Sequence, residues 1–362
     1  MKIDFIISNL GGGGAERVLA LMVNSLAKNK SNKISVITLF QDKEEYILDP
    51  SVNRVKLKQT SFIPSHTLRS IVNLSRYYKT KSNRPDVIVS FVTLTNLITI
   101  IVAKLFSIKI IAQEHNSHLR YMKGRKRMTD FTKKYLYKRA DVITVLTSFD
   151  VEFYSNHGAN VYVMPNPCSF KSIRENTHIR EKTILAVGHL NRYHHKGFDN
   201  LIKLIAPLLK KHTQWHLKIA GAGDEGLKYL KQLASEHKIV DKIIFTGFID
   251  DISKIMYESS IFILPSRFEG LPMVLLEAMS QGMACISYDC KTGPSDIIEN
   301  EKNGLLIEDQ NIAKMQKGLS DLILNEELRI RLSNEGIKSL DKYDISAITK
   351  RYEDLFDEVI KR

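Results

Sequence analysis

A strand, a glycine-containing turn and a helix follow one another over residues 261–282, and this order restricts the fold more than any other stretch. Ile261 to Leu264 is a continuous apolar run, which predicts a strand buried in a parallel sheet. Pro272 suits the first turn of a helix, because its missing N–H would lack a partner there anyway. Gly282 stands where a left-handed helix cap is expected. The free amides of the helix would then face the loop, which is how an anion site is built.

Two glutamates belong to this stretch, Glu269 on the loop and Glu277 about a turn and a half inside the helix. Carboxylates beside the positive end of a helix suit a ligand that carries hydroxyl groups next to phosphates. An ordinary strand–helix turn with two solvated glutamates fits the same geometry, so the pattern alone leaves both interpretations open.

Strands and helices alternate along the whole chain, which indicates α/β architecture with parallel sheets. The 362 residues are enough for two domains with sizeable cores. Strands are expected at 3–7, 34–40, 52–57, 86–91, 109–113, 141–146, 161–164, 183–187, 216–220, 242–246, 261–264, 284–287 and 304–307. Helices are expected at 15–28, 67–81, 95–106, 228–237, 312–324, 327–342 and 345–361.

Composition excludes several classes of protein. The three cysteines follow no metal-ligand or disulfide spacing, so we expect free thiols in a reducing compartment. The longest apolar region, Val87 to Ala112, is interrupted by Asn96 and Lys104 and fits a strand, a helix and a strand better than a membrane span. The first eight residues are too short an apolar run for a signal peptide and predict a first strand.

The net charge of +13 lies entirely in the first half of the chain. Residues 1–167 hold 25 Lys and Arg against 12 Asp and Glu, whereas residues 168–362 hold 28 of each kind. A basic face attracts anionic partners, either phospholipid headgroups or nucleic acid. A diffuse, solvated basic surface is the alternative.

The basic residues concentrate between Leu119 and Arg139, where aromatic and apolar side chains are interleaved with them. The nine cations are Arg120, Lys123, Arg125, Lys126, Arg127, Lys133, Lys134, Lys138 and Arg139. This composition favours an interfacial helix on anionic lipid, at roughly 1 kcal/mol per cation near the surface. RNA binding and an exposed helix without a partner remain as alternatives, although no RNA-binding motif is present.

The pair Glu-x7-Glu, embedded in Ser-Arg-Phe-Glu-Gly-Leu-Pro-x-Val-Leu-Leu-Glu-Ala-Met-x-x-Gly, resembles the signature of the retaining glycosyltransferases of family 4, which have the GT-B fold. The resemblance covers essentially the whole chain and is strongest from Gly188 to Ile307. It implies that Glu269 contacts the donor sugar and that Glu277 holds the nucleotide ribose. The backbone of Gly270 and Leu271 would bind the diphosphate.

A second stretch of the resemblance runs from Gly188 to Gly197. The family usually has Gly-Arg-Leu and then Lys-Gly, with the arginine and the lysine gripping the diphosphate. Here Lys196 matches the lysine, while His189 occupies the place of the arginine and Arg192 follows three residues late. We expect Lys196 and Arg192 to bind the diphosphate near Gly188, with a solvated basic loop as the alternative.

In the first half, four glycines follow the first strand, but no reading frame gives Gly-x-Gly-x-x-Gly. The resemblance implies that Gly13 and Gly14 lie near the donor phosphates. His115 follows the strand at 109–113, where a histidine is often a structural hydrogen-bonding residue. The resemblance assigns it to the donor sugar, with Glu114 orienting it.

The resemblance also implies two facing Rossmann-like domains with the active cleft between them. Residues 1–167 would bind the acceptor and residues 168–344 the nucleotide sugar, with a last helix at about 345–362 crossing back to the first domain. Backbone groups of Phe248 and Ile249 would read the base. Pro165-Asn166-Pro167-Cys168 resembles the hinge between the domains, and the polar segment Ser169 to Lys182 is typical of a linker.

The implied reaction moves a hexose or N-acetylhexosamine from a nucleotide diphosphate sugar, by family frequency a UDP-sugar, to a hydroxyl group with retention of configuration. We expect no metal and no cofactor, because Asp-x-Asp is absent from a plausible donor position and Asp250-Asp251 instead begin a helix. The expected acceptor is a membrane-associated glycan or lipid-linked sugar of bacterial capsule or O-antigen synthesis. The enzyme would then be cytoplasmic and peripheral on the inner membrane face.

Three other functions remain as alternatives. A sugar-nucleotide epimerase of similar fold would convert the donor without an acceptor. A non-catalytic protein would bind the nucleotide sugar without turning it over. An RNA-binding protein would use the basic segment, although we expect no nucleic acid as a partner.

Overall fold

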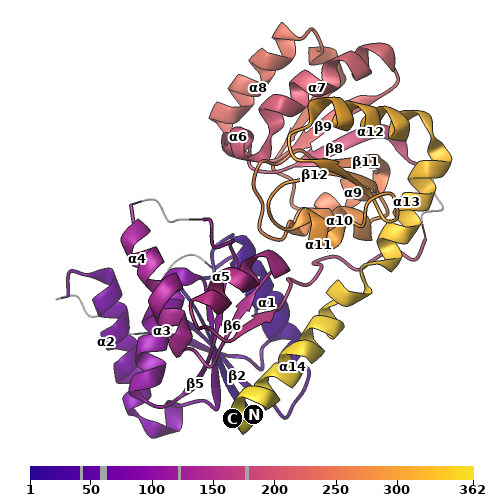
Figure 1. Ribbon diagram of the computed structural model, residues 1–362. Helices are drawn as coiled ribbons and strands as arrows, with labels where there is room; N and C mark the ends of the chain where they lie inside the picture. Colours follow the sequence, from indigo (N-terminus) through magenta and orange to yellow (C-terminus); the bar gives the residue numbers. More distant parts are fainter. Residues whose placement is uncertain (41–43, 58–62, 121–123, 176–178) are drawn as a thin grey trace. The chain divides into compact units, whose positions relative to one another are not determined.

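The computed structural model describes residues 1–40, 44–57, 63–120, 124–175 and 179–362. The chain divides into two compact units. Unit 1 comprises Met1–Pro167 together with Tyr343–Arg362, and unit 2 comprises Cys168–Lys342. Each unit contains one parallel sheet with helices packed against it (Figure 1). The expectation of α/β architecture with two Rossmann-like domains is confirmed.

The sheet of unit 1 has the strand order β3-β2-β1-β4-β5-β6-β7, and all its strand pairs are parallel. Its strands are β1 (Lys2–Ile7), β2 (Lys33–Thr38), β3 (Asn53–Lys56), β4 (Val87–Phe91), β5 (Lys109–Gln113), β6 (Val142–Val145) and β7 (Val161–Val163). Its helices are α1 (Gly14–Leu26), α2 (His66–Lys79), α3 (Thr93–Leu105), α4 (Lys126–Phe131), α5 (Val151–Asn156) and α14 (Ile345–Lys361).

Strand β1 is an inner strand of this sheet and is buried on both faces, as its apolar sequence requires. Phe5 pairs with Val36 of β2 on one side and with Val89 of β4 on the other. Asp4 is the one acidic residue of the strand and is fully buried. It accepts a hydrogen bond of 2.8 Å from the Tyr78 hydroxyl, and its burial raises the pKa of the carboxyl to about 6.

The long apolar region from Val87 to Ala112 forms β4, α3 and β5, as predicted. Asn96, which interrupts it, is buried and donates from its amide to the Gln113 carbonyl and the Tyr137 hydroxyl, both at 3.0 Å. The amide nitrogen of Asn96 therefore has two acceptors inside the unit. In the described ranges no helix is both long and apolar enough to cross a membrane.

Helix α14, the last of the chain, packs on unit 1 (Figure 1). Its buried side chains recur at helical spacing and include Ile348, Tyr352 and Phe356. The Thr349 hydroxyl donates to the Ser25 hydroxyl of α1 at 2.9 Å. The chain therefore enters unit 2 after Pro167 and returns to unit 1 for its last twenty residues.

The sheet of unit 2 is also entirely parallel, with the order β10-β9-β8-β11-β12-β13. Its strands are β8 (Glu181–Val187), β9 (His216–Ala220), β10 (Ile243–Gly247), β11 (Ser259–Leu264), β12 (Ala284–Asp289) and β13 (Leu305–Glu308). Its helices are α6 (Tyr193–Lys196), α7 (Phe198–Lys211), α8 (Asp224–Glu236), α9 (Ile252–Glu258), α10 (Met273–Ser280), α11 (Pro294–Ile297), α12 (Ile312–Leu324) and α13 (Glu326–Lys338).

The strand order reverses once in each sheet, between β1 and β4 in unit 1 and between β8 and β11 in unit 2. In open α/β sheets, ligands bind in the crevice outside the carboxyl ends of the strands at such a reversal. The topology therefore predicts that ligands bind at the loops after β1 and β4, and at those after β8 and β11.

Candidate active site

Lys196 and Glu269 meet at the reversal point of the unit 2 sheet. Lys196 ends α6, in the connection that follows β8, and Glu269 lies on the loop that follows β11. Lys196 Nζ is 2.8 Å from Glu269 Oε1, and the two side chains are only 16% and 10% exposed. Ser266 also donates its hydroxyl to Glu269 Oε1, at 2.6 Å. Two residues predicted for the site, 73 positions apart in the chain, are therefore in direct contact.

Gly188 permits the approach of Lys196. A Cβ atom at Gly188 would lie 3.3 Å from Cγ of Lys196 and 3.3 Å from the ring of Phe198. Those separations are tighter than ordinary van der Waals contact, so a side chain at position 188 would displace the lysine stem. The stem can lie across Gly188 because glycine has no side chain. Gly188 therefore contributes to the site by leaving room for Lys196.

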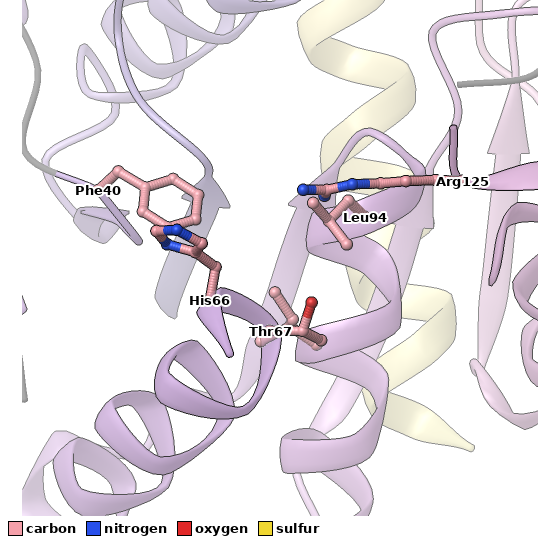
Figure 2. Close-up of a pocket in the computed structure, with 6 residues that line it drawn as sticks. Phe40, His66, Thr67, Leu94 and Arg125 are labelled. Atoms are coloured by element: carbon pink, nitrogen blue, oxygen red, sulfur yellow. The ribbon is translucent and has the colours of Figure 1, made fainter. Parts of the chain in front are cut away.

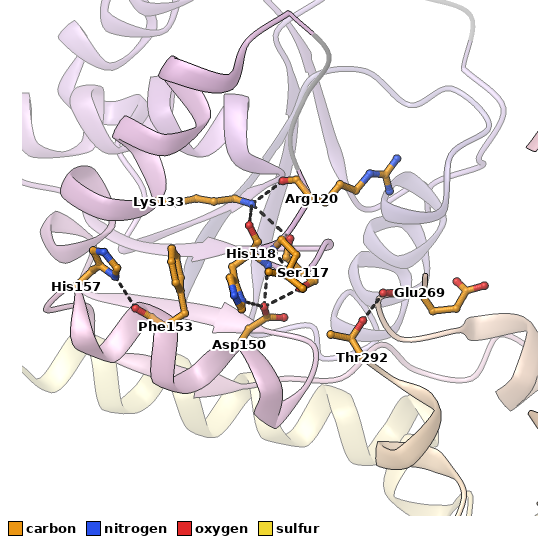
Figure 3. Close-up of polar contacts among 10 residues, drawn as sticks. Ser117, His118, Arg120, Lys133, Asp150, Phe153, His157, Glu269 and Thr292 are labelled. Carbon is orange, nitrogen blue, oxygen red and sulfur yellow. Dashed lines mark hydrogen bonds and ion pairs between the residues drawn. The ribbon is translucent and has the colours of Figure 1, made fainter. Parts of the chain in front are cut away.

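The loop that carries Glu269 is held from a second side. The Thr292 hydroxyl donates to the carbonyl oxygen of Glu269 (Figure 3). Gly270 is partly accessible, whereas the side chain of Leu271 is buried. Pro272 occupies the capping position of α10, which spans Met273–Ser280, one residue earlier than a first-turn placement.

Glu277 lies inside α10 and is only 4% exposed. One of its carboxylate oxygens, Oε1, accepts a hydrogen bond of 2.7 Å from the hydroxyl of Ser169, which follows the junction between the units. The interpretation of Glu269 and Glu277 as two solvated glutamates is therefore wrong. Buried carboxylates that are held by fixed hydrogen-bond donors are typical of a ligand-binding site.

The remaining predicted residues of unit 2 lie on loops at the same sheet edge. Arg192 ends a 3-10 turn, Leu190–Arg192, and its side chain is exposed. His189, which stands in the place of the usual arginine, accepts a hydrogen bond at Nδ1 from the backbone N–H of Asn191. Phe248, just beyond β10, is 74% exposed and Ile249 is half-buried.

In unit 1, the glycine segment connects β1 to α1. Gly13 is the residue before α1 and Gly14 is its first residue, so their backbone groups belong to the start of a 13-residue helix. Gly14 is exposed, and the carbonyl oxygen of Gly13 accepts a hydrogen bond of 3.1 Å from the hydroxyl of Tyr46. The loop thus presents the beginning of a helix at the reversal point of this sheet.

His115 follows β5 and stacks on Phe91, the last residue of β4, with a ring-centroid distance of 4.9 Å. Its Nε2 atom is buried, and burial lowers the pKa of the imidazole to about 3, so His115 is neutral at physiological pH. Glu114 does not serve the expected role of orienting His115. It turns into unit 1 and accepts a hydrogen bond from the Tyr137 hydroxyl.

Val92, between Phe91 and α3, has a φ of 74°. A positive φ is strained for a β-branched residue and is retained only where the surrounding structure imposes it. Its N–H donates to the Gln113 carbonyl at 3.0 Å, which joins the ends of β4 and β5 beside His115. The strain therefore lies at the sheet edge where ligand binding is expected.

A compact polar cluster fixes the loop that follows His115 (Figure 3). Asp150 Oδ1 accepts from the backbone N–H of His118 at 2.7 Å and lies 2.6 Å from Nδ1 of the same residue. Lys133, which is 2% exposed, donates to the carbonyl oxygens of Ser117, His118 and Arg120 at 3.4, 3.0 and 2.8 Å. Its burial lowers the pKa of Lys133, an effect opposed by Glu114 and Asp150.

The basic segment 119–139 departs from a single interfacial helix. It contains α4, a π-helical turn at Thr132–Leu136 and a 3-10 turn at Tyr137–Arg139. Lys133 points inward, so its assignment to a lipid-facing surface is wrong. Lys123 lies outside the described residues, as do Tyr121 and Met122. Of the others, Arg120, Arg125, Lys126, Arg127, Lys138 and Arg139 are exposed.

Unit 1 also contains a pocket of about 290 Å³ near the end of β2 and the starts of α2 and α3 (Figure 2). It is lined by Phe40, His66, Thr67, Leu94, Ile98 and Arg125. The rings of Phe40 and His66 meet edge to face, with centroids 6.2 Å apart. The pocket therefore combines apolar walls with one guanidinium group.

Within the described ranges, no group of three or more His, Cys, Asp or Glu side chains is arranged to hold a metal ion. Asp251 caps the start of α9 and accepts from the Ser253 N–H at 3.1 Å, in agreement with its interpretation as a helix-start residue. Sequence reasoning missed the supporting residues of the site, such as Ser266, Thr292 and Phe91. Only the contact distances distinguish them from other residues of their type.

Comparison with known proteins shows the family to which the chain belongs. The model of "Glycosyltransferase Family 4" matches residues 12–170 and that of "Glycosyl transferases group 1" matches residues 169–339. An uncharacterized glycosyltransferase of Haemophilus influenzae is 32% identical over 97% of this chain and 98% of its own length. An α-1,4-N-acetyl-D-galactosaminyltransferase of Campylobacter jejuni, named for a diNAcBac-PP-undecaprenol acceptor, is 30% identical over 99% of both chains.

The fold of this chain is also similar to the folds of solved structures. The structure of HepE from Anabaena in complex with UDP has a TM-score of 0.74, with 13% identity over 99% of this chain and 100% of that one. At that identity the likeness concerns the fold alone. Taken with the two matching family models and the full-length relatives, it shows that this chain belongs to the group 1, family 4 glycosyltransferases of the GT-B fold.

Proposed function

We propose that the protein transfers a hexose or N-acetylhexosamine from a UDP-sugar to a hydroxyl group, with retention of the anomeric configuration. The contact between Lys196 and Glu269 supports this most directly, because it joins a cation and a carboxylate at the ligand-binding edge of a parallel sheet. The donor would bind to unit 2. HepE, which shares the fold, was solved with UDP, and this supports a uridine nucleotide.

The roles of the side chains follow from the charges that the reaction moves. When the bond between the anomeric carbon and the phosphate oxygen breaks, negative charge develops on the diphosphate. Lys196, Arg192 and the amides of Gly270 and Leu271 would stabilise that charge, as preorganised donors do in a site shielded from water. Glu269 would accept hydrogen bonds from sugar hydroxyls, and Glu277 would bind the ribose.

Retention would arise from attack on the same face that the diphosphate leaves. The acceptor oxygen forms the new bond to the anomeric carbon as the phosphate oxygen departs, and the acceptor proton passes to that phosphate oxygen. No side chain needs to form a covalent intermediate, and the two glutamates need not act as acid and nucleophile as in a glycosidase. We further propose that no metal ion takes part, so that the rate with EDTA equals the rate with added Mg²⁺ or Mn²⁺.

For the acceptor, we propose a membrane-associated glycan or lipid-linked sugar of bacterial surface polysaccharide synthesis, bound by unit 1. The diphospho-undecaprenol named for the Campylobacter relative supports this choice. The positive charge of residues 1–167 is consistent with binding to a diphosphate or to an anionic lipid surface. Exposed Phe131 and Tyr135 lie among the exposed cations of segment 119–139, and the pocket beside Arg125 offers apolar walls to a lipid.

The test of the reaction measures UDP release and product formation by the full chain with a panel of UDP-sugars and a polyprenyl-diphosphate-linked acceptor. Glu269→Gln and Lys196→Ala should each reduce kcat by about 10²-fold or more, as loss of a charge-stabilising group does. Glu327→Gln and Lys231→Ala, which change exposed residues of the same unit, are the matched controls. Near-normal rates in folded Glu269→Gln and Lys196→Ala would refute the assignment.

The same assay separates the alternatives. An epimerase would convert the UDP-sugar without an acceptor, whereas a non-catalytic protein would bind UDP without turnover. Proton NMR of the product reports the anomeric configuration, and an inverted product would reject the retaining mechanism. RNA-binding measurements at two salt concentrations would reveal a nucleic-acid partner by their strong salt dependence.

Membrane association has its own test. Co-sedimentation with phosphatidylglycerol vesicles at low salt should be reduced by the double variant Arg125→Glu and Arg127→Glu. The matched control, Lys228→Glu with Lys231→Glu, changes the same charge on unit 2 and should bind like the unaltered protein. Absence of binding by the unaltered protein, or equal losses in both double variants, would remove the proposal of a membrane-facing unit 1.

A further inference from the structure

Arg267 lies two residues before Glu269 but does not point toward solvent. Its guanidinium makes a bidentate contact with Asp199, with Nη1 at 2.8 Å from Oδ1 and Nη2 at 3.2 Å from Oδ2. The two side chains are 16% and 13% exposed. Asp199 lies in the first turn of α7, three residues after Lys196. A pair that is planar, bidentate and largely buried fixes both distance and orientation.

The same arginine binds the Lys196 loop through the backbone. The N–H of Arg267 donates to the His195 carbonyl at 3.0 Å, and Nη1 also donates to the His194 carbonyl. Gly197 comes close to the other loop, since a Cβ atom there would lie 1.9 Å from the Pro265 carbonyl oxygen. The loop after β8 and the loop after β11 are therefore held together at several points on one side of Lys196.

The contacts of Arg267 with Asp199, His194 and His195 form a clamp between the two loops. This clamp lies next to the lysine and the glutamate on which the proposed reaction depends. Lys196 precedes Gly197 and Glu269 follows Arg267 by two residues, so any movement between the two loops changes the separation of Nζ and Oε1, which is 2.8 Å. Displacement of reacting groups by about 1 Å can cost on the order of 10²-fold in rate. The alignment of the lysine and the glutamate thus depends on contacts that neither of them makes.

We propose that Arg267 and Asp199 are positioning residues for sugar transfer, which set the separation of Lys196 and Glu269 without touching the substrate. The inference rests on the proposed function of Lys196 and Glu269. The guanidinium of Arg267 already contacts the Asp199 carboxylate and the His194 carbonyl oxygen, so these groups rather than a phosphate are its ligands. Lysine cannot replace it, because an ammonium group lacks the planar fork that binds both carboxylate oxygens.

The test is a double-mutant cycle with Arg267→Ala, Asp199→Ala and the double variant, with Arg267→Lys as the mildest change. Each single variant should lower kcat at least about tenfold while KM for the UDP-sugar and Kd for UDP change much less. The double variant should be no worse than either single variant, because both remove one shared contact. Glu308→Ala, which removes an exposed ion pair with Lys314 in the same unit, is the matched control and should keep full kcat.

The outcomes separate the possible roles. If Arg267 bound the phosphate directly, Arg267→Ala would raise the Kd for UDP and Asp199→Ala would not, which would overturn the proposal. If the pair served stability alone, variants that remain folded by Trp215 fluorescence would keep their kcat, and this also would overturn it. Rescue of kcat in Arg267→Lys to the level of the unaltered enzyme would contradict the requirement for a planar fork.

A readout without turnover keeps this inference distinct from the proposed function. Acetylation of Lys196 by an N-hydroxysuccinimide ester, followed by mass spectrometry, should become several-fold faster in Arg267→Ala as the ammonium leaves Glu269. Unchanged labelling of Lys196 would overturn the clamp whatever the activity. Failure of the unaltered protein to bind UDP or transfer any sugar, with faster labelling in the variant, would instead reject the proposed function and leave the clamp as a structural fact.

Discussion

The buried carboxyl of Asp4 makes the stability of unit 1 depend on pH in the direction opposite to that of a salt-bridged aspartate. Asp4 is fully buried in β1, and its pKa is raised from the ordinary value of 3.8 to about 6, chiefly by desolvation. The hydrogen bond from Tyr78 at 2.8 Å favours the charged form but does not cancel that effect. The perturbation that reports on this group is Asp4→Asn, which keeps the shape and removes the proton equilibrium.

The size of the change in the free energy of unfolding follows from the linkage between proton binding and folding. Between pH 3.8 and about pH 6 the folded chain binds more protons at Asp4 than the unfolded chain, so its contribution to the free energy of unfolding falls as pH rises. At 1.36 kcal/mol per unit of pKa difference, the complete fall is on the order of 3 kcal/mol, and about 2 kcal/mol of it lies between pH 4.5 and pH 7.5. Any fixed cost of the Asn amide in this pocket is the same at each pH and cancels from the trend.

Amide hydrogen exchange of the β1 peptide measures this locally, and comparison of the two proteins at equal pH cancels intrinsic exchange rates. The exchange-derived stability of the unaltered protein should fall relative to Asp4→Asn by about 2 kcal/mol from pH 4.5 to pH 7.5. Fluorescence of Trp215, in the core of unit 2, is the control and should give the same urea transition for both proteins. A difference that stays constant across this pH range would refute the reasoning.

Three further predictions concern the loops of the site. Gly197→Ala should lower the stability of unit 2 by about 2 kcal/mol or more, because the residue has a φ of 70° and its Cβ would meet the Pro265 carbonyl oxygen. Urea titration of Trp215 fluorescence checks this, and an unchanged midpoint would contradict it. Gly188→Ala should move the stem of Lys196 and reduce kcat/KM about tenfold or more, with an unchanged urea midpoint; full activity would show that the lysine stem adapts. Lys133→Met should destabilise unit 1 by on the order of 1–3 kcal/mol and accelerate hydrogen exchange of residues 117–120, since three carbonyl oxygens lose their donor. Lys134→Met, the adjacent lysine, is its control, and equal exchange in both variants would contradict the role of Lys133.

Local pattern determined much of the fold. The apolar run Ile261–Leu264 became the buried strand β11, and the interrupted region from Val87 to Ala112 became a strand, a helix and a strand. These elements are readable because their burial imposes a periodicity on neighbouring residues. The same holds for Gly282, whose φ of 72° is the left-handed cap expected after α10.

The direction in which individual side chains point was harder to predict from the sequence. Lys133 belongs to a run of cations that composition assigns to a lipid surface, yet it is buried beneath the loop that follows His115. Glu114 stands beside His115 in the chain and bonds to Tyr137 instead. A charged residue is turned inward by partners that come from other elements, and composition carries no information about those partners.

By itself the sequence determined the alternation of strands and helices, the family signature around Glu269 and Glu277, and the separation of charge between the two halves of the chain. The tertiary structure alone decided that Lys196 contacts Glu269 and that Arg267 grips Asp199, residues 68 or more positions apart. Propensity and periodicity act between neighbours in the chain, whereas these contacts exist only because the parallel sheet brings the ends of β8 and β11 side by side.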